Sequence, residues 1–287
     1  SAKPLVVTAM APLGEDYVAK LSEGLSARWM DLYPRENKVS GAYMSGSAYG
    51  VHPYVLMNYN DDFESVSTLA HEWGHAVHTM LSSETQPFET ARYPIFLAEI
   101  ASTVNEVLLV DDRMQVATTD DEKLYYLGFL LEQWRGTFFR QAMFAEYELQ
   151  VHEAFADGTP LSGARLSEMY GDILKRYHGH DEGVLTIDPT FHIEWAYIPH
   201  FYRNFYVYQY ATSITAGAAF AEKILAGDTQ ARDAYLNMLR AGGSDDPHAL
   251  LVAAGVDMTT AAPYEAVFRK LNSVMDQIEA ILDNQEQ

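Results

Sequence analysis

The sequence predicts a mostly helical protein with one small β element. Apolar residues recur at helical spacing along nearly all of the 287 residues, and only one short segment is rich in β-forming residues. Hydrophobic residues make up 48% of the chain, enough for a sizeable core, and no internal repeat or linker interrupts it. We therefore expect a single domain, residues 1–287.

The first quarter of the chain is expected to contain a helix, a loop and the strand. Residues 13–33 have helical periodicity, and Pro34 follows them. Residues 41–49 (GAYMSGSAY) are rich in Gly and Ser, which predicts a mobile loop. Residues 53–59 (PYVLMNY) form a short apolar run with β-forming residues, which predicts the strand.

The rest of the chain is expected to be helical. Asp61 and Asp62 offer N-caps for a helix that reaches about Leu81. The further helices are expected over residues 95–110, 120–158, 163–178, 200–226, 229–240, 246–254 and 263–284.

Composition excludes several classes of partner and site. The net charge of −21, from 19 basic and 40 acidic residues, argues against nucleic acid or an anionic membrane as partner. The chain has no Cys, so any metal must be held by nitrogen and oxygen atoms, and a cytoplasmic location is expected. No signal peptide is expected, because the apolar residues 4–10 are too few, and no apolar stretch is long enough to span a bilayer.

The segment His71-Glu72-Trp73-Gly74-His75 carries the clearest chemical signal. Two histidines four residues apart on a helix project from one face, so both imidazoles can bind one metal ion. Glu72 lies a step around the same helix, beside that ion. The pattern matches the zinc-peptidase motif, in which the two histidines bind Zn²⁺ and the glutamate acts as general base.

A hydrolytic zinc site usually has three protein ligands and a fourth position for water. Glu99, within the segment FLAEIAS, is the strongest candidate for the third ligand, because a carboxylate amid apolar residues needs a reason to be there. The alternative is a carboxylate that only faces the positive end of a helix dipole.

Three neighbours of the motif have more than one interpretation. His78 shares the face of the two histidines, but a fourth protein ligand would abolish the water position, so we expect a packing or supporting role. Glu106 could orient a ligand histidine or lie on a solvated helix face. Gly74 is costly inside a helix, and close approach of the helix that carries Glu99 would explain it.

Four segments together resemble the oligoendopeptidase F family of thimet-type zinc oligopeptidases. They are HEWGHAVH, FLAEIAS, the preceding GAYMSG and the later HFYRNFYVYQYATS, and APLGEDY near the start agrees with them. The resemblance implies a multi-helix, zincin-like metallopeptidase catalytic domain. Members of the family are about twice as long, so the chain resembles the C-terminal catalytic part. In the family, an N-terminal half forms the other wall of a deep substrate channel.

The resemblance also assigns roles to single residues. It implies that His71, His75 and Glu99 bind one Zn²⁺ and that Glu72 is the base. A His and a Tyr from the later segment are implied as hydrogen-bond donors to the oxyanion. His200 matches that histidine, and Tyr208, then Tyr202, are the preferred matches for the tyrosine, with Tyr206 also a candidate. The alternative for each tyrosine is a place in a buried helix core.

Peptide substrates commonly lengthen the edge of a sheet. Leu56, Met57 and Asn58 lie on the expected strand just before the zinc motif, and they are our candidates for that edge. Gly41 and Gly46 in the preceding loop would let a peptide backbone approach closely. A plain surface loop is the alternative.

The predicted function is a zinc-dependent metallo-endopeptidase that hydrolyses internal bonds of short, unstructured peptides. One alternative is a catalytically impaired zinc-binding fragment that needs an N-terminal fragment of the same protein as partner. A second alternative is a zinc carboxypeptidase of similar helical build.

Overall fold

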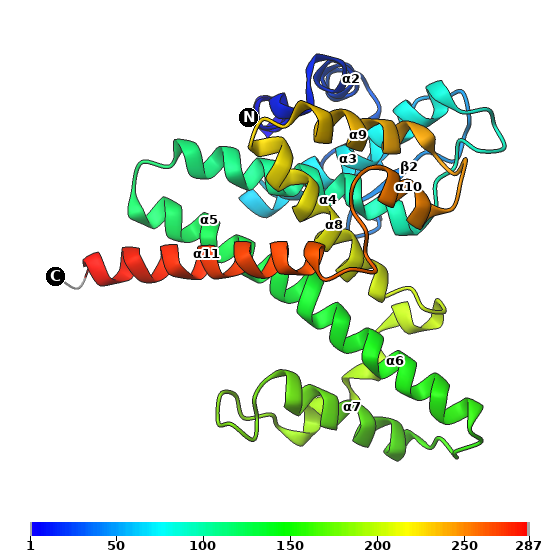
Figure 1. Cartoon of the computed structure of the whole chain (residues 1–287), viewed down its shortest axis with the longest axis vertical. Coiled ribbons are helices and arrows are strands. Elements are labelled where there is room, and N and C mark those ends of the chain that lie inside the picture. Colours follow the sequence, from blue (N-terminus) through cyan, green and yellow to red (C-terminus); the bar gives the residue numbers. More distant parts are fainter. Residues whose placement is uncertain (1, 286–287) are drawn as a thin grey trace. The chain divides into compact units, whose positions relative to one another are not determined.

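Residues 2–285, which the computed structural model describes, form eleven α-helices and one small sheet (Figure 1). The predicted class, mostly helical with one small β element, is confirmed. The chain divides into two compact units: unit 1 comprises residues 1–132 and 212–287, and unit 2 comprises residues 133–211. The single domain over residues 1–287 stays a prediction. Every helix within residues 2–285 is too short or too polar to cross a membrane.

The α-helices are α1 (Ala2–Ala9), α2 (Glu15–Ser26), α3 (Phe63–Thr85), α4 (Ile95–Val116), α5 (Asp120–Trp134), α6 (Arg140–Ala156), α7 (Gly163–Tyr177), α8 (Tyr208–Leu225), α9 (Thr229–Ala241), α10 (Pro247–Ala253) and α11 (Ala262–Gln285). The strands are β1 (Met30–Asp31), β2 (Tyr43–Ser45) and β3 (Tyr54–Leu56). Short 3₁₀ segments cover Ala11–Leu13, Pro189–Tyr197 and Pro199–Tyr202, and one π-helical turn, Arg135–Phe139, joins α5 to α6.

Two predicted elements were wrong near the sheet. The helix expected over residues 13–33 ends at Ser26, because Met30 and Asp31 pair with β3 instead of continuing it. The segment 41–49, expected to be a loop, contains β2. In both places pairing with a strand distant in sequence overrides the local preference, which a single sequence does not reveal.

The helix expected over residues 200–226 begins eight residues later than predicted, at Tyr208. Phe205 has a φ of +50°, a left-handed conformation that an α-helix cannot pass through. Residues 199–202 form a short 3₁₀ turn instead. The helix expected over residues 120–158 is present as α5 and α6, with the π-helical turn between them.

The core of unit 1 forms around α3, which lies along α4 (Figure 1). Trp73 of α3 is fully buried, and α2 approaches it so closely that a Cβ on Gly24 would lie 2.1 Å from its ring. A buried hydrogen-bond chain joins three helices: the Tyr17 hydroxyl donates to the Asn105 side-chain oxygen (2.8 Å), and the Asn105 amide donates to the Ala70 carbonyl (2.9 Å). These contacts fix α3, the helix of the histidine motif, on two sides.

The sheet of unit 1 has the order β1-β3-β2. β3 is the central strand, parallel to β1 and antiparallel to β2. Among the described residues β2 therefore has one edge unpaired, and this strand packs against α3.

Unit 2 has its own apolar core between α6, α7 and the 3₁₀ segment Pro189–Tyr197. Tyr147 and Tyr170 contact each other edge to face in this core, with ring centroids 5.2 Å apart. The carboxylate of Glu194 accepts a hydrogen bond from the Tyr170 hydroxyl (2.5 Å) and forms an ion pair with Arg140. Unit 2 is thus held together by contacts within residues 133–211.

Candidate metal centre

Helix α3 presents the two histidines of the motif from one face. Its first turn is capped by Asp62, whose side chain accepts a hydrogen bond from the Ser65 amide at 2.8 Å. The His71 and His75 rings lie 4.9 Å apart between centroids and are nearly perpendicular, at 83°. The four-residue spacing places them one turn apart, as the sequence predicted.

Helix α4 brings Glu99 to both histidines. Its Oε2 lies 3.3 Å from His71 Nε2 and 3.4 Å from His75 Nε2. One atom from each residue can be chosen so that all three atoms lie within 4.8 Å of one another. The Ser102 hydroxyl donates to the same carboxylate oxygen at 3.0 Å and helps to fix it. Two imidazole nitrogens and one carboxylate oxygen thus converge on one point.

Close packing at Gly74 makes this convergence possible. A Cβ at this position would lie 2.7 Å from the Ala101 carbonyl oxygen and 2.8 Å from Ser102 Cα, both backbone atoms of α4. The missing side chain therefore lets the backbones of α3 and α4 touch beside the histidines. This geometry supports the explanation that the sequence suggested for a glycine inside the motif.

Glu106 lies on α4 two turns beyond Glu99 and faces His71 from its other side. Its Oε1 is 3.3 Å from His71 Nδ1. A carboxylate in this position fixes the orientation of the ring and leaves Nε2 directed toward Glu99. Of the two interpretations left open for Glu106, the structure favours the one in which it orients a ligand.

The charges of the cluster shift its pKa values strongly. Burial lowers the pKa of His71, but Glu106 and Glu99 outweigh burial and raise it well above its usual value. Burial raises the pKa of Glu99, but hydrogen bonds from His71 and His75 hold it well below its usual value. The carboxylate of Glu99 is therefore ionised, as a metal ligand must be.

Glu72 is only 6% exposed and is not one of the three converging residues. Burial raises its pKa, while His71 and His75 lower it in part. The nearby backbone amide of Met44 on β2 also lowers this pKa in part. A buried carboxylate with a raised pKa next to a metal site is suited to accept a proton.

His78 is fully buried beneath the cluster and is not part of it. Its ring stacks on Tyr93, with centroids 3.5 Å apart and planes 9° apart, and both ring nitrogens lack a hydrogen-bond partner within residues 2–285. Burial lowers its pKa well below the usual value, so the ring is neutral. The packing role expected for His78 agrees with this position. Nothing in the sequence pattern pointed to Tyr93, because it lies in the loop between α3 and α4.

The residues expected at a sheet edge lie on or just after the central strand, and their role in peptide binding stays a prediction. Leu56, Met57 and Asn58 lie on or just after β3, the central strand, whose edges are both paired. Leu56 pairs with Tyr43 on one side and with Asp31 on the other. The Met57 amide donates to the Asp31 carbonyl at 2.9 Å. Among the described residues β1 and β2 each have one unpaired edge, and β2 is the one that packs against α3.

The two glycines predicted to let a peptide approach lie on either side of β2, Gly41 before it and Gly46 after it. Gly41 has a φ of +85°, and its carbonyl accepts a hydrogen bond from the Asn58 side chain at 2.8 Å. The Asn58 side chain thus fixes the backbone of the loop that precedes β2. A Cβ on Gly46 would lie 2.5 Å from Thr79 Cγ2, so this glycine lets the chain after β2 approach α3.

The predicted oxyanion donors belong to unit 2. His200 and Tyr202 lie in the 3₁₀ turn Pro199–Tyr202, and Tyr202 is 89% exposed. Tyr208 is the first residue of α8 and is 38% exposed. The Tyr206 hydroxyl is 3.0 Å from that of Tyr210, and its ring stacks 5.7 Å from the His200 ring. None of these tyrosines is a fully buried core residue, and their catalytic role stays a prediction.

Comparison with known proteins decides the family. The model of Peptidase family M3 matches residues 5–270. The chain belongs to peptidase family M3. The resemblance to oligoendopeptidase F inferred from the sequence is confirmed by relatives of that name. The converging His71, His75 and Glu99 are therefore a candidate metal group in a member of a metallopeptidase family.

Relatives align along nearly the whole of this M3 chain. Oligopeptidase PepF of Bacillus subtilis is 43% identical over 98% of the chain and 41% of the relative. Oligoendopeptidase F, plasmid, of Lactococcus lactis subsp. cremoris is 38% identical over 96% of the chain and 45% of the relative. The crystal structure of oligoendopeptidase-F from Enterococcus faecium superposes with a TM-score of 0.74 at 32% identity, covering 99% of the chain and 44% of that structure. The chain spans less than half the length of these relatives.

Proposed function

We propose that this protein is a zinc-dependent metallo-endopeptidase that hydrolyses internal bonds of short peptides. The observation that carries the proposal is the convergence of His71, His75 and Glu99, with the buried carboxylate of Glu72 beside them. Two imidazoles and one carboxylate are a donor set typical of catalytic zinc. The name of the relatives, oligoendopeptidase F, supports the substrate class.

The residues present suit zinc better than an alkaline-earth ion. Two of the three converging donors are imidazole nitrogens, whereas Mg²⁺ and Ca²⁺ prefer an all-oxygen shell. Glu106 on the far nitrogen of His71 supplies the second carboxylate that often accompanies a histidine ligand. The chemistry that zinc supplies when bound here is Lewis acidity, which polarises the scissile carbonyl and lowers the pKa of the attacking water.

The side chains of the protein perform the proton transfers. Glu72 takes a proton from the attacking water and passes it to the nitrogen of the leaving amine. Its burial and raised pKa favour the first step, because a carboxylate that binds its proton more tightly is a stronger base. The backbone amide of Met44 on β2 lies near this carboxylate and lowers its pKa in part. His200 and Tyr208, or else Tyr202, donate hydrogen bonds to the oxyanion.

The unpaired edge of β2 is the proposed binding site for the peptide backbone. All three residues of β2 lie opposite residues of β3, and the backbone amide of Met44 lies near the Glu72 carboxylate. A peptide added at this edge would thus run past the general base. Gly41, before β2, keeps its proposed role in letting that peptide approach. Because the chain spans less than half the length of its relatives, a further segment that walls the channel is a proposed partner.

The test compares the wild-type chain with Glu72→Gln in the presence of zinc. Turnover of an internally quenched peptide should fall by ~10²–10⁴-fold, because the amide keeps the size of the side chain but cannot accept the proton. Mapping the products by mass spectrometry should show internal cleavage. Release of single C-terminal residues would instead identify a carboxypeptidase. Unchanged turnover in Glu72→Gln would remove the proposed base.

A further inference from the structure

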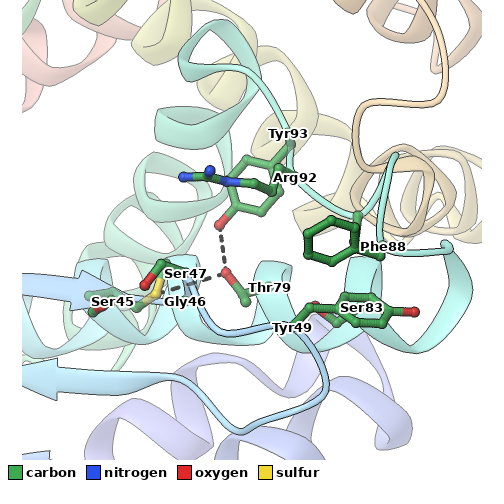
Figure 2. A pocket seen from close by; sticks show the side chains of 11 residues that line it. Ser45, Gly46, Ser47, Tyr49, Thr79, Ser83, Phe88, Arg92 and Tyr93 are labelled. Atoms are coloured by element: carbon green, nitrogen blue, oxygen red, sulfur yellow. Dashed lines mark hydrogen bonds between the residues drawn. The ribbon is translucent and has the colours of Figure 1, made fainter.

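A cavity of about 300 Å³ lies in unit 1 beside the metal centre, between β2, α3 and the loop that precedes α4 (Figure 2). Its lining combines small hydroxyl side chains, aromatic rings and one arginine. The lining residues that the argument uses most are Ser45, Thr79, Ser83, Phe88, Arg92 and Tyr93. The reaction proposed above uses none of these side chains.

The cavity shares its walls with the metal centre. Thr79 follows His75 by one helical turn on α3. The Tyr93 hydroxyl lies 2.8 Å from Thr79 Oγ1 and donates to the His75 carbonyl at 3.3 Å. Met44, whose amide faces Glu72, also lines the cavity. A peptide on the edge of β2 would therefore place one of its side chains, or one of its ends, in this cavity.

The charge of the lining differs from that of the protein as a whole. The chain carries 40 acidic residues, yet the lining contains no carboxylate and one cation, Arg92. Within residues 2–285 the exposed guanidinium of Arg92 takes part in no hydrogen bond or ion pair, so it is available to a ligand. The hydroxyls of Ser45, Ser47 and Ser83 add neutral donors. The lining is suited to an anionic group.

Aromatic rings form the other wall of the cavity. Tyr49 and Phe88 meet edge to face with centroids 5.7 Å apart, and the Tyr49 hydroxyl is occupied by a hydrogen bond to the Gln86 carbonyl at 2.8 Å. Tyr93 is held by its stacking on His78. These rings can cover the carbon atoms of a ligand and reduce its contact with water, which strengthens an ion pair at Arg92.

We infer that this cavity is a specificity subsite for a carboxylate of the peptide, bound by Arg92. A guanidinium binds a carboxylate through two parallel hydrogen bonds, which gives both affinity and orientation. The carboxylate comes either from an Asp or Glu side chain or from the free C-terminus of the peptide. This inference rests on the proposed function, because it needs a peptide on the edge of β2.

The experiment measures binding, so it does not depend on turnover. The whole chain with Glu72→Gln is loaded with zinc and titrated into dye-labelled hexapeptides, and fluorescence anisotropy gives each Kd. The neutral reference peptide has Gln at every tested position and a C-terminal amide. One set of peptides has Glu at one position at a time, and a last peptide has a free C-terminal carboxylate.

Either a Glu peptide or the free-acid peptide should bind about 10-fold or more tightly than the reference. Adding Arg92→Gln should abolish this preference, and Arg92→Lys should restore part of it, because lysine keeps the charge but not the two parallel bonds. Arg165→Gln, at an exposed position of α7 in unit 2, is the matched control and should leave the preference intact. Melting curves show whether each variant remains folded.

The peptide series distinguishes a side-chain carboxylate from a C-terminal one. It also separates failure of the carboxylate subsite from failure of the proposed peptidase function. A preference for Glu identifies a side-chain subsite, and a preference only for the free acid identifies a C-terminal subsite. Equal affinities for all peptides, a preference that survives Arg92→Gln, or no binding by any peptide would overturn the inference. Cleavage of the neutral peptide by the wild-type chain, measured separately, tests the proposed function whatever the binding result.

Discussion

The α3–α4 pair of unit 1 and residues 189–211 of unit 2 hold their predicted catalytic groups in different ways. On α3 and α4 the groups are fixed by regular helices in contact at Gly74, and Glu72 is buried. Residues 189–202 instead form two 3₁₀ segments, Phe205 has a positive φ, and Tyr202 is almost fully exposed. One region holds its groups in a rigid framework, and the other carries them on irregular backbone.

This difference explains which parts of the site the sequence could predict. His71 and His75 follow from spacing alone, because a regular helix converts a separation of four residues into a shared face. No such rule relates His200 to Tyr202 or Tyr208, because a short 3₁₀ turn and irregular backbone connect them and no continuous α-helix does. The sequence therefore predicts the metal group residue by residue, but it leaves the tyrosine open.

The same argument applies to the sheet. The sequence predicted β3 from its own composition, but β1 and β2 are two and three residues long and exist through pairing with β3. Such short strands have no periodicity of their own. The candidate substrate edge was consequently placed on Leu56, Met57 and Asn58, on or just after the central strand and not on an outer strand. The Arg92 cavity was missed for a similar reason, since three separate segments build it.

The sharpest test of the comparison is to change the tyrosines of the irregular region. Tyr208→Phe should lower kcat by up to ~10²–10³-fold with little change in KM, because an oxyanion donor acts mainly in the transition state. Steady-state kinetics on this variant, beside Tyr202→Phe and Tyr206→Phe, measure the effect. A loss of kcat only in Tyr202→Phe would move the role to the 3₁₀ turn. Equal turnover in all three variants would leave the phenols without a catalytic role.

The close packing of α3 against α4 can be disrupted at Gly74, where the two backbones touch. Gly74→Ala should destabilise unit 1 by about 1–3 kcal/mol, because the new methyl group meets backbone atoms of α4 that cannot move aside. Zinc affinity should fall with it, since α4 carries Glu99. Gly128→Ala on α5 is the matched control: no atom lies within 4 Å of its added Cβ, and alanine should stabilise that helix by up to about 1 kcal/mol. Urea unfolding and zinc titration report both effects.

A smaller effect is expected at a buried carboxylate in unit 2. Glu148 of α6 accepts a hydrogen bond from the Phe205 amide at 2.8 Å, and burial raises its pKa. Its pKa in the folded protein lies above the value of about 4.3 in the unfolded chain. The free energy of unfolding therefore falls as the pH rises from the unfolded pKa to the folded pKa. Glu148→Gln, which keeps the acceptor, should raise the melting temperature at pH 7 and make it less dependent on pH. A lower melting temperature at pH 7 would show that the ionised carboxylate stabilises the turn.

The zinc content of the chain tests the central assignment most directly. Wild type, Glu72→Gln and the His71→Ala/His75→Ala double variant are dialysed against buffered zinc and analysed by mass spectrometry. Wild type and Glu72→Gln should each retain one zinc ion per chain, because Glu72 is not among the three converging residues. The double variant should retain none. Stoichiometric zinc in the double variant, or its loss from Glu72→Gln, would contradict the assignment of ligands and base.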